Sequence, residues 1–258
     1  MLNAVLDEDI LWRDCVVHEI DSHLKPPRWV IFVVGFLIGF LVCFCCKGEE
    51  YNCNPIRQAN VPYSAHLSDL ESHCSRPDIY REEDRVTWAH EMTHGVNADL
   101  KNSTPSAEDS FFYVYNNKAF RVIKPRNVTM IQVKLRLPYI GTAFNTYFST
   151  QAINEWNNDI TFFLDEWCAY INGCMCGLEL HLTDRTVASF DKANQLGLYS
   201  IIATKDLNQK DINDYIKYQM DRTELIKSAL PNYNKQYYNT LKQYYTGKTD
   251  TLQVIRSE

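Results

Sequence analysis

The longest uninterrupted apolar stretch of the chain lies near its N-terminus. Residues 29–46 carry no charge over 18 positions, which is long enough to span a bilayer when flanking residues reach the interfaces. Arg28 precedes the stretch and Lys47 follows it, and basic residues of this kind commonly flank membrane helices. The pattern predicts one transmembrane helix that contacts membrane lipid over residues 29–46, after an N-terminal tail over residues 1–28.

The surroundings of this span indicate its orientation. The long, acid-containing tail before it and the lack of a small-residue cleavage site after it favour a retained signal anchor over a cleaved signal peptide. Basic residues are slightly more frequent before the span, which predicts a single-pass protein whose C-terminal domain is extracytoplasmic or lumenal. Sequons at Asn102 and Asn127 agree with that side, whereas palmitoylation of the cysteines that end the span would need the opposite orientation.

Two glycines within the span bear on the oligomeric state. Gly35 and Gly39 have the spacing that lets two membrane helices approach closely, so a homodimer through the transmembrane helix is one interpretation. The ordinary glycine frequency of membrane helices explains the same spacing and is the simpler interpretation.

After the span, the pattern changes to that of a globular domain. Residues 47–77 are polar and interrupted by prolines, which is typical of a juxtamembrane connector. Two β-favouring runs, residues 111–115 and 119–124, flank Asn116–Lys118 and predict a β-hairpin, whose edge is a candidate for pairing with an extended peptide. Residues 128–137 fit strand alternation and helical periodicity equally well.

Helical periodicity dominates the rest of the domain, which we assign to residues 78–258. Apolar residues recur at three- and four-residue spacing in five segments: from between residues 78 and 84 to about 100, 143–156, 160–171, 206–230 and 233–244. The expected fold class is therefore α+β, a helix-rich domain with a small β-hairpin, preceded by one transmembrane helix.

Composition and charge narrow the range of functions. The chain has 16 Tyr and 12 Phe among its 258 residues, which favours an ordered core over disorder. Its net charge is −6, and it contains no basic block and no nucleic-acid-binding motif. We therefore expect no nucleic-acid partner.

Five cysteines follow the span and raise the question of disulfides. They are Cys53, Cys74, Cys168, Cys174 and Cys176. An oxidising compartment would allow them to form two disulfides with one thiol left over, and the sequence leaves the connectivity open. A bond between Cys53 and Cys74 would clamp the segment that enters the first predicted helix of the domain.

This first helix contains the sequence H-E-x-x-H from His90 to His94. Residues four apart lie on one face of a helix, so two imidazoles at this spacing can bind one zinc ion. Glu91 lies between them, where a carboxylate can act on a water molecule at the metal. The alternative is an amphipathic helix with two surface histidines, but the apolar stripe beside the two histidines favours a metal site.

A catalytic zinc site needs a third protein ligand and leaves one position to water. The metzincin pattern would need glycine at position 97 and histidine at position 100, where this chain has Asn97 and Leu100. Glu166 is the preferred third ligand, because it is an acid within an apolar helical run, where a carboxylate is costly unless it is paired or metal-bound. The alternative ligands are Asp165, Glu179 and His181, and Asp99 is a candidate for orienting a histidine ring.

The sequence Glu-Trp-Cys-Ala that begins at Glu166 has the form E-x-x-A, and it lies downstream of H-E-x-x-H. With it, the chain resembles the gluzincin metallopeptidases, which combine H-E-x-x-H with a glutamate on a downstream helix. The resemblance covers the two helices and their order. It implies a zincin-like domain that binds Zn²⁺ through His90, His94 and Glu166, with Glu91 as the general base in hydrolysis of a peptide or protein substrate.

Peptide hydrolysis also needs a group that stabilises the oxyanion. Tyr170, one helical turn beyond Glu166, is the first candidate, and Tyr113 and Tyr115 are alternatives. Two other functions stay open at this point. One is a catalytically inactive zincin-like binding or structural module on a membrane anchor, and the other is a metal-independent membrane protein whose motif is accidental.

Overall fold

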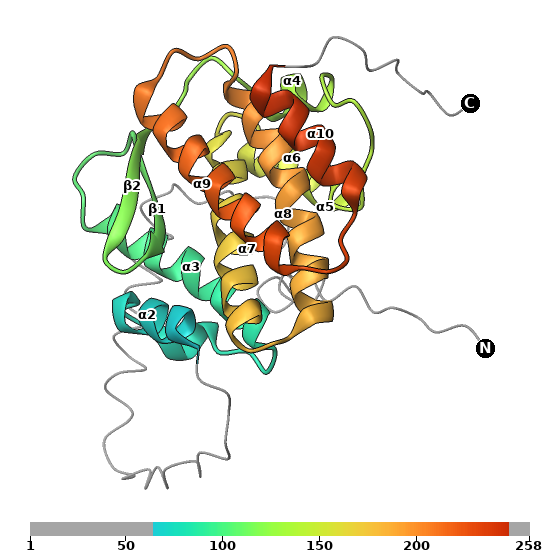
Figure 1. Ribbon diagram of the computed structural model, residues 1–258. Helices are drawn as coiled ribbons and strands as arrows, with labels where there is room; N and C mark the ends of the chain where they lie inside the picture. The colour runs from blue at the N-terminus through green and yellow to red at the C-terminus, as the bar shows by residue number, and fades with distance from the viewer. Residues whose placement is uncertain (1–63, 248–258) are drawn as a thin grey trace, which may run out of the picture. The chain divides into compact units, whose positions relative to one another are not determined.

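The computed structural model describes residues 64–247, and the ribbon in Figure 1 follows their helices and strands in chain order. The elements are α2 (Ala65–His73), the 3-10 helix η2 (Pro77–Tyr80), α3 (Arg85–Asn102), β1 (Asp109–Tyr115), β2 (Lys118–Ile123), α4 (Met130–Lys134), α5 (Phe144–Tyr147), α6 (Thr150–Trp156), α7 (Thr161–Glu179), α8 (Thr183–Thr204), α9 (Lys210–Ala229) and α10 (Lys235–Thr246). The expected helix-rich α+β class with a small antiparallel sheet is confirmed for this part of the chain.

Most of the expectations for the N-terminal part of the chain fall on residues that the structure does not describe. The tail over residues 1–28, the span over residues 29–46 and most of the connector over residues 47–77 lie outside the described residues. The end of the connector contains α2, which packs against α3. Within residues 64–247, none of the helices is both long and apolar enough to cross a bilayer.

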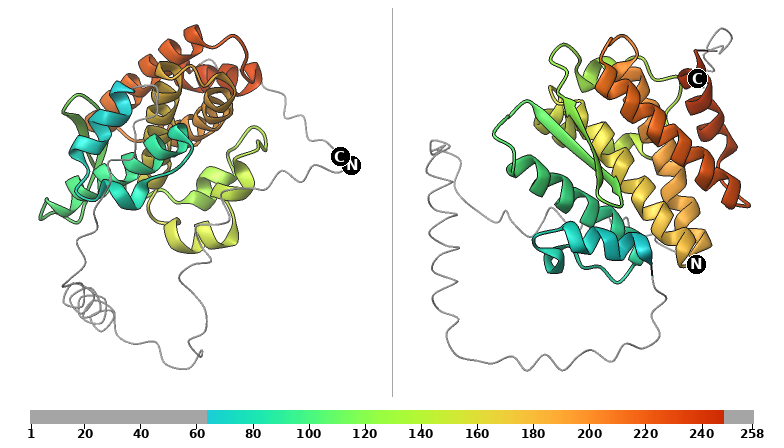
Figure 2. Two further views of the ribbon diagram at one scale, coloured as in Figure 1. Left: turned by 90° about the horizontal axis from the view of Figure 1, so that it is seen from below. Right: turned by 60° about the vertical axis from the view of Figure 1, so that its left-hand side comes forward.

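The β-hairpin forms where the two β-favouring runs predict it. β1 and β2 pair in antiparallel fashion, and the turn residues Asn116 and Asn117 have positive φ angles of 52° and 58°. Two-residue hairpin turns require such angles, and asparagine tolerates them better than most residues. The hairpin lies between α3, which contacts β1, and α9, which contacts β2 (Figure 2).

Three helical predictions are refined by the structure. The ambiguous segment 128–137 contains a short helix, α4, that begins with a capping box between Thr129 and Gln132. The segment 143–156 divides into α5 and α6, because Ser149 caps α6 in a β-like conformation that interrupts the helix. The helix expected over 160–171 continues to Glu179.

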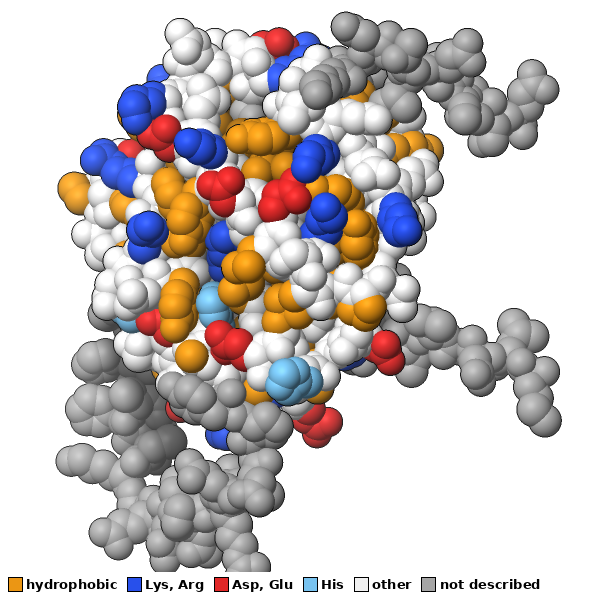
Figure 3. All heavy atoms as spheres, viewed as in Figure 1, with side chains coloured by type: hydrophobic (Ala, Val, Ile, Leu, Met, Phe, Trp, Pro, Cys, Tyr) orange, Lys and Arg blue, Asp and Glu red, His pale blue; other side chains and the backbone are white. Residues whose placement is uncertain are grey.

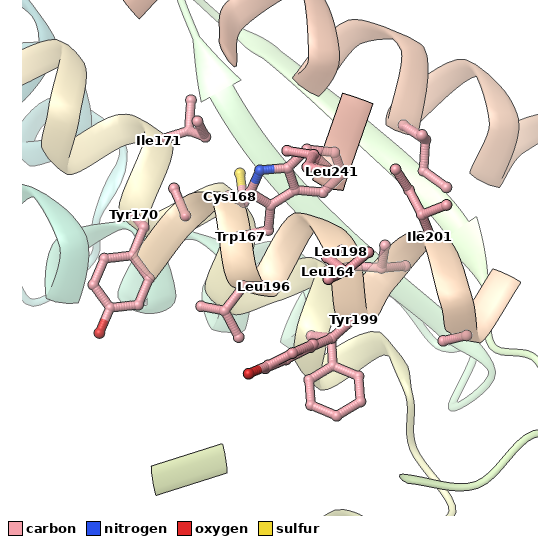
Figure 4. Packing of buried hydrophobic residues seen from close by; sticks show 14 of the residues in the cluster. Leu164, Trp167, Cys168, Tyr170, Ile171, Leu196, Leu198, Tyr199, Ile201 and Leu241 are labelled. Carbon is pink, nitrogen blue, oxygen red and sulfur yellow. The ribbon is translucent and has the colours of Figure 1, made fainter. Parts of the chain in front are cut away.

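The main core lies where α7 and α8 pack side by side, with α9 and α10 against them (Figure 1). Trp167 and Leu164 of α7 are fully buried and meet Leu196 and Leu198 of α8, and Leu241 of α10 joins the same cluster (Figure 4). On the outer face shown in Figure 3, basic and acidic side chains are interspersed with exposed apolar ones.

The expected disulfides do not form among the described cysteines. Cys74, Cys168, Cys174 and Cys176 are buried free thiols. The last three lie on α7 but point toward different neighbours: Cys168 donates to the Tyr113 carbonyl at 3.1 Å, Cys174 to that of Thr186 at 3.7 Å and Cys176 to that of Arg85 at 3.5 Å. Two disulfides among the five cysteines after the span are therefore not formed, because four of the five are free thiols. The pairing of Cys74 with Cys53 involves a residue outside the described part.

A second close helix contact joins α3 and α7 and depends on glycine. A Cβ atom on Gly173 would lie 2.9 Å from the backbone oxygen of Val86, and one on Gly177 would lie 2.9 Å from the Val86 side chain. Both distances are shorter than ordinary van der Waals contact. The two glycines therefore allow α7 to approach the helix that carries the H-E-x-x-H sequence.

We expect Gly173→Ala to destabilise the full-length protein by about 1–3 kcal/mol, because the added methyl group meets backbone rather than a flexible side chain. Helix propensity alone predicts the opposite sign, since alanine favours helices over glycine by about 1 kcal/mol. The free energy of unfolding, measured with denaturant, checks this. A variant as stable as the wild type would contradict the close contact.

Candidate metal centre

Helix α3 presents the two histidines on one face. The helix begins at Asp84, whose carboxylate accepts from the Thr87 backbone N–H at 3.2 Å and from Arg185 at 2.6 Å. One helical turn separates His90 from His94, so both rings project from the same side. Their ring centroids are 4.8 Å apart, and their Nε2 atoms are 3.1 Å apart.

Helix α7 brings Glu166 to the same place. Its Oε2 lies 3.6 Å from His90 Nε2, and its Oε1 lies 3.8 Å from His94 Nε2. Ligands about 2.0–2.1 Å from a tetrahedral zinc are separated by about 3.3 Å from each other. One donor atom from each of the three residues lies within 4.8 Å of the other two, a somewhat wider spacing than a bound zinc ion requires. Among residues 64–247, His90, His94 and Glu166 form the group of His, Cys, Asp or Glu side chains that could hold a metal ion. The ligand set predicted from sequence converges.

Asp165 orients one of the rings. Its Oδ2 accepts from His94 Nδ1 at 2.7 Å, which keeps a proton on Nδ1 and makes Nε2 the ring nitrogen that faces His90 and Glu166. Its Oδ1 accepts from the Asn97 amide at 2.6 Å, and Asn97 in turn accepts from the Tyr113 backbone N–H at 2.6 Å. The sequence suggested Asp165 as an alternative ligand, but the structure gives it this orienting position.

His90 is held differently from His94. Its Nδ1 is buried and has no hydrogen-bond partner within the described part of the chain. The ring of Tyr170 packs edge-on against it, with centroids 4.2 Å apart. Tyr170 is 8% exposed and belongs to the same buried cluster as Trp167 (Figure 4). Packing therefore fixes the orientation of His90, whereas a carboxylate fixes that of His94.

Tyr147, at the end of α5, is a neighbour that the sequence did not single out. Its hydroxyl donates to Glu166 Oε2 at 2.9 Å and lies 3.0 Å from the hydroxyl of Tyr170. The Tyr147 hydroxyl therefore contacts both Glu166 and the hydroxyl of Tyr170. A tyrosine carried by a short helix outside the motif gives no periodic signal by which sequence reasoning could find it.

Glu91 borders the same centre without joining the ligand set. Its Oε1 lies 3.9 Å from His90 Nε2, and its side chain is partly exposed. The side chains of His90, Glu166 and His94 are 11%, 12% and 23% exposed, so the centre keeps some contact with solvent. Glu91, which is 24% exposed, is the more accessible of the two glutamates at the centre.

The charges at the centre suit a cation. Burial lowers the pKa of His94, but the carboxylates of Asp165, Glu166 and Glu91 outweigh it and raise that pKa to about 10. Burial, with Asp165 and Glu91, raises the pKa of Glu166 to about 7 against the opposing effects of His94 and Tyr147. Burial and the nearby His94 and Lys192 cations hold the pKa of His90 well below its usual range. A proton on His94 therefore balances the acids when no metal is bound.

The other candidate ligands lie elsewhere. Glu179 accepts from the Ser64 hydroxyl at 2.8 Å and from His66 Nδ1 at 3.0 Å at the start of α2. His181 follows α7 in a turn with a φ of 57°. Asp99, the candidate for orienting a histidine, instead accepts from the backbone N–H of Ser75 at 2.6 Å.

The two alternative oxyanion candidates, Tyr113 and Tyr115, and the outer edge of β1 have other interaction partners in the structure. The hydroxyl of Tyr113 donates to Asp69 at 2.8 Å, and Tyr115 stacks on His66. The outer edge of β1 is taken at Tyr113, because its N–H donates to Asn97 and its carbonyl accepts from Asn172 at 2.9 Å. An extended peptide cannot pair with β1 at this position without displacing both side chains.

Comparison with known proteins adds no family to this geometry. The chain matches no protein-family model, no curated protein and no solved structure.

We expect Asp165→Asn to lower the zinc affinity of the full-length protein about tenfold to a hundredfold, because His94 loses the carboxylate that orients its ring. Competition with a chelator of known affinity measures this. Asp99→Asn is the matched control and should leave the affinity within about twofold, since Asp99 contacts Ser75. Equal losses in the two variants would contradict the orienting position of Asp165.

Zinc affinity should rise with pH, because zinc binds only the deprotonated ligands. Between about pH 7 and pH 9, binding must release the proton of His94, so the affinity should rise about tenfold per pH unit. Below about pH 7 the proton of Glu166 must also leave, and the dependence should steepen. Calorimetry in buffers of different ionisation enthalpy counts these protons, and zinc binding at neutral pH without proton release would contradict the raised pKa values.

Proposed function

We propose that the described domain is a zinc-dependent peptidase of the gluzincin kind, in which His90, His94 and Glu166 hold Zn²⁺. The observation that carries the proposal is the convergence of these donors from two helices, although Glu166 lies 72 positions after His94 in the chain. Two imidazoles and one carboxylate form a common ligand set of catalytic zinc. A zinc ion bound in such a site lowers the pKa of a water molecule toward about 7 and polarises a carbonyl group.

Glu91 supplies the proton transfers in this proposal. Its partly exposed carboxylate lies 3.9 Å from His90 Nε2, where it accepts a proton from the attacking water and then donates it to the leaving amine. Asp165 keeps His94 in one tautomer throughout. The centre therefore has separate groups for binding the cation, orienting a ligand and moving a proton.

Two tyrosine hydroxyls are available to stabilise the oxyanion. Tyr170, expected from the sequence, lies against His90, and Tyr147 lies between Tyr170 and Glu166. Hydroxyl groups that already point toward a site stabilise developing charge without reorganisation. In our proposal the pair acts together, with one hydroxyl supporting the position of the other.

The biological setting follows from the sequence. The span over residues 29–46 anchors the peptidase in a membrane as a single-pass protein, with the domain extracytoplasmic or lumenal and a peptide or protein as its substrate. The main competing proposal is an inactive zincin-like module that binds zinc without turnover. The presence of Glu91 beside the ligand set favours the peptidase over this module.

Glu91→Gln should keep one bound zinc and lose peptide hydrolysis by about two to four orders of magnitude, because the proton acceptor is gone while the three ligands stay. Zinc content and turnover of a mixed peptide library are measured on the same full-length preparations. His94→Ala is the comparison that should lose both zinc and turnover. A wild type that binds zinc but hydrolyses nothing would favour the inactive module.

A further inference from the structure

Asn172 of α7 joins three other elements of the domain through one buried side chain. Its Nδ2 donates to the Thr93 hydroxyl of α3 at 3.0 Å and to the Tyr113 carbonyl of β1 at 2.9 Å. Its Oδ1 accepts from the Arg222 guanidinium of α9 at 2.6 Å. A side-chain amide has two N–H donors, so both donors of Asn172 are engaged. Helix α7 contacts both α3 and α9 (Figure 1), and this amide links the two.

Arg222 sets the direction of these hydrogen bonds. A guanidinium only donates, so the amide oxygen of Asn172 must face α9 and its nitrogen must face α3 and β1. Arg222 is 8% exposed, and its other hydrogen-bond partners among residues 64–247 are Gln219 and His66, neither of which is an acid. A buried cation with such partners costs stability, and residues of this kind are found more often at functional sites than elsewhere in a fold.

Thr93 brings the first connection to the metal centre, because it precedes His94 within the H-E-x-x-H sequence. Its buried hydroxyl donates to the Ala89 carbonyl at 2.8 Å and therefore accepts the N–H of Asn172. Successive residues of a helix are separated by about 100° around its axis. Holding Thr93 toward α7 therefore fixes the direction in which His94 projects from α3.

The Tyr113 peptide forms the second connection. Its carbonyl accepts from Asn172, while its N–H donates to Asn97 at 2.6 Å. Asn97 donates in turn to Asp165, the carboxylate that orients the ring of His94. The two routes from Asn172 therefore end at the backbone of His94 and at its imidazole.

We propose that Arg222 and Asn172 are positioning residues of the metal centre, which hold His94 in the orientation that zinc requires. They act through Thr93 and Asn97 rather than by contact with the ion. A ligand whose rotamer is already fixed by such a network binds a metal more tightly than one that is free to turn. The proposal rests on the metal centre of the proposed function and does not depend on turnover.

Zinc affinity of threonine variants tests the first connection. Thr93→Val should lower the zinc affinity of the full-length protein about threefold to tenfold, because Asn172 loses the hydroxyl to which it donates, whereas Thr93→Ser should keep most of it. Thr204→Val on α8 is the matched control, since this buried hydroxyl also donates to the carbonyl four residues earlier, at 2.8 Å. It should change the affinity by less than about twofold. Equal losses in Thr93→Val and Thr204→Val would overturn the proposal.

Variants of Arg222 test the origin of the network. Arg222→Met removes the charged donor to Asn172 and should lower the zinc affinity by a similar factor of about three to ten. Arg222→Lys keeps a cationic donor and should recover most of the affinity. Chelator competition and denaturant unfolding are measured on the same preparations. A loss of stability in Arg222→Met with wild-type zinc affinity would show that Arg222 supports only the fold, and would overturn its positioning role.

NMR of the metal-free, full-length protein labelled with ¹⁵N-histidine separates this proposal from the proposed function. The Nδ1 proton of His94, which Asp165 accepts, should give a signal that Thr93→Val and Arg222→Met shift or weaken and that Thr204→Val leaves in place. If this holds while the wild type binds no zinc, the positioning residues stand and the peptidase proposal fails. If the wild type hydrolyses peptides with zinc while all three variants keep its signal and affinity, the peptidase proposal stands and the positioning residues are wrong.

Discussion

The close contact between α3 and α7 is the constraint on which the candidate site depends. Gly173 and Gly177 remove the side chains that would separate α7 from Val86. At this separation, the imidazoles of His90 and His94 meet the carboxylate of Glu166, which is largely buried. A buried carboxylate is costly unless a positive charge compensates it. The proton on His94 supplies this charge without metal, and a divalent cation would supply it more fully.

The residues around the ligands connect the site to the rest of the domain. Asp165 and Asn97 link His94 to the backbone of β1, so the hairpin is fixed against the helix that carries the histidines. On the other side, Asn172 donates to Thr93 of α3 and accepts from the buried Arg222 of α9 at 2.6 Å. Side-chain amides thus replace the pairing partner that a third strand would supply. This explains how a two-stranded hairpin can be part of a rigid core.

The sequence predicted those features that depend on local spacing. The H-E-x-x-H sequence requires only that residues 85–102 be helical, and Glu166 was recognised because an acid in an apolar run needs a partner. The hairpin followed from two β-favouring runs around an Asn-Asn pair. In each case the residue types and their separation along the chain carry the information.

Features that arise from tertiary contacts were missed. Helix α8 was not among the predicted helices, and its buried surface includes Asn194, Gln195 and Ser200 as well as apolar residues. The roles of Asp165 and Tyr147 depend on which helices meet, which single-chain spacing does not encode. The cysteines of α7 suggested disulfides, but buried thiols that donate to backbone carbonyls pack like small apolar residues.

The most direct test of the central claim is zinc K-edge X-ray absorption on the zinc-loaded full-length protein. The account predicts one zinc per chain, with only nitrogen and oxygen ligands at about 2.0–2.2 Å and with the scattering pattern of two imidazoles. Sulfur ligands at about 2.3 Å, or a protein that retains no zinc at neutral pH, would contradict it.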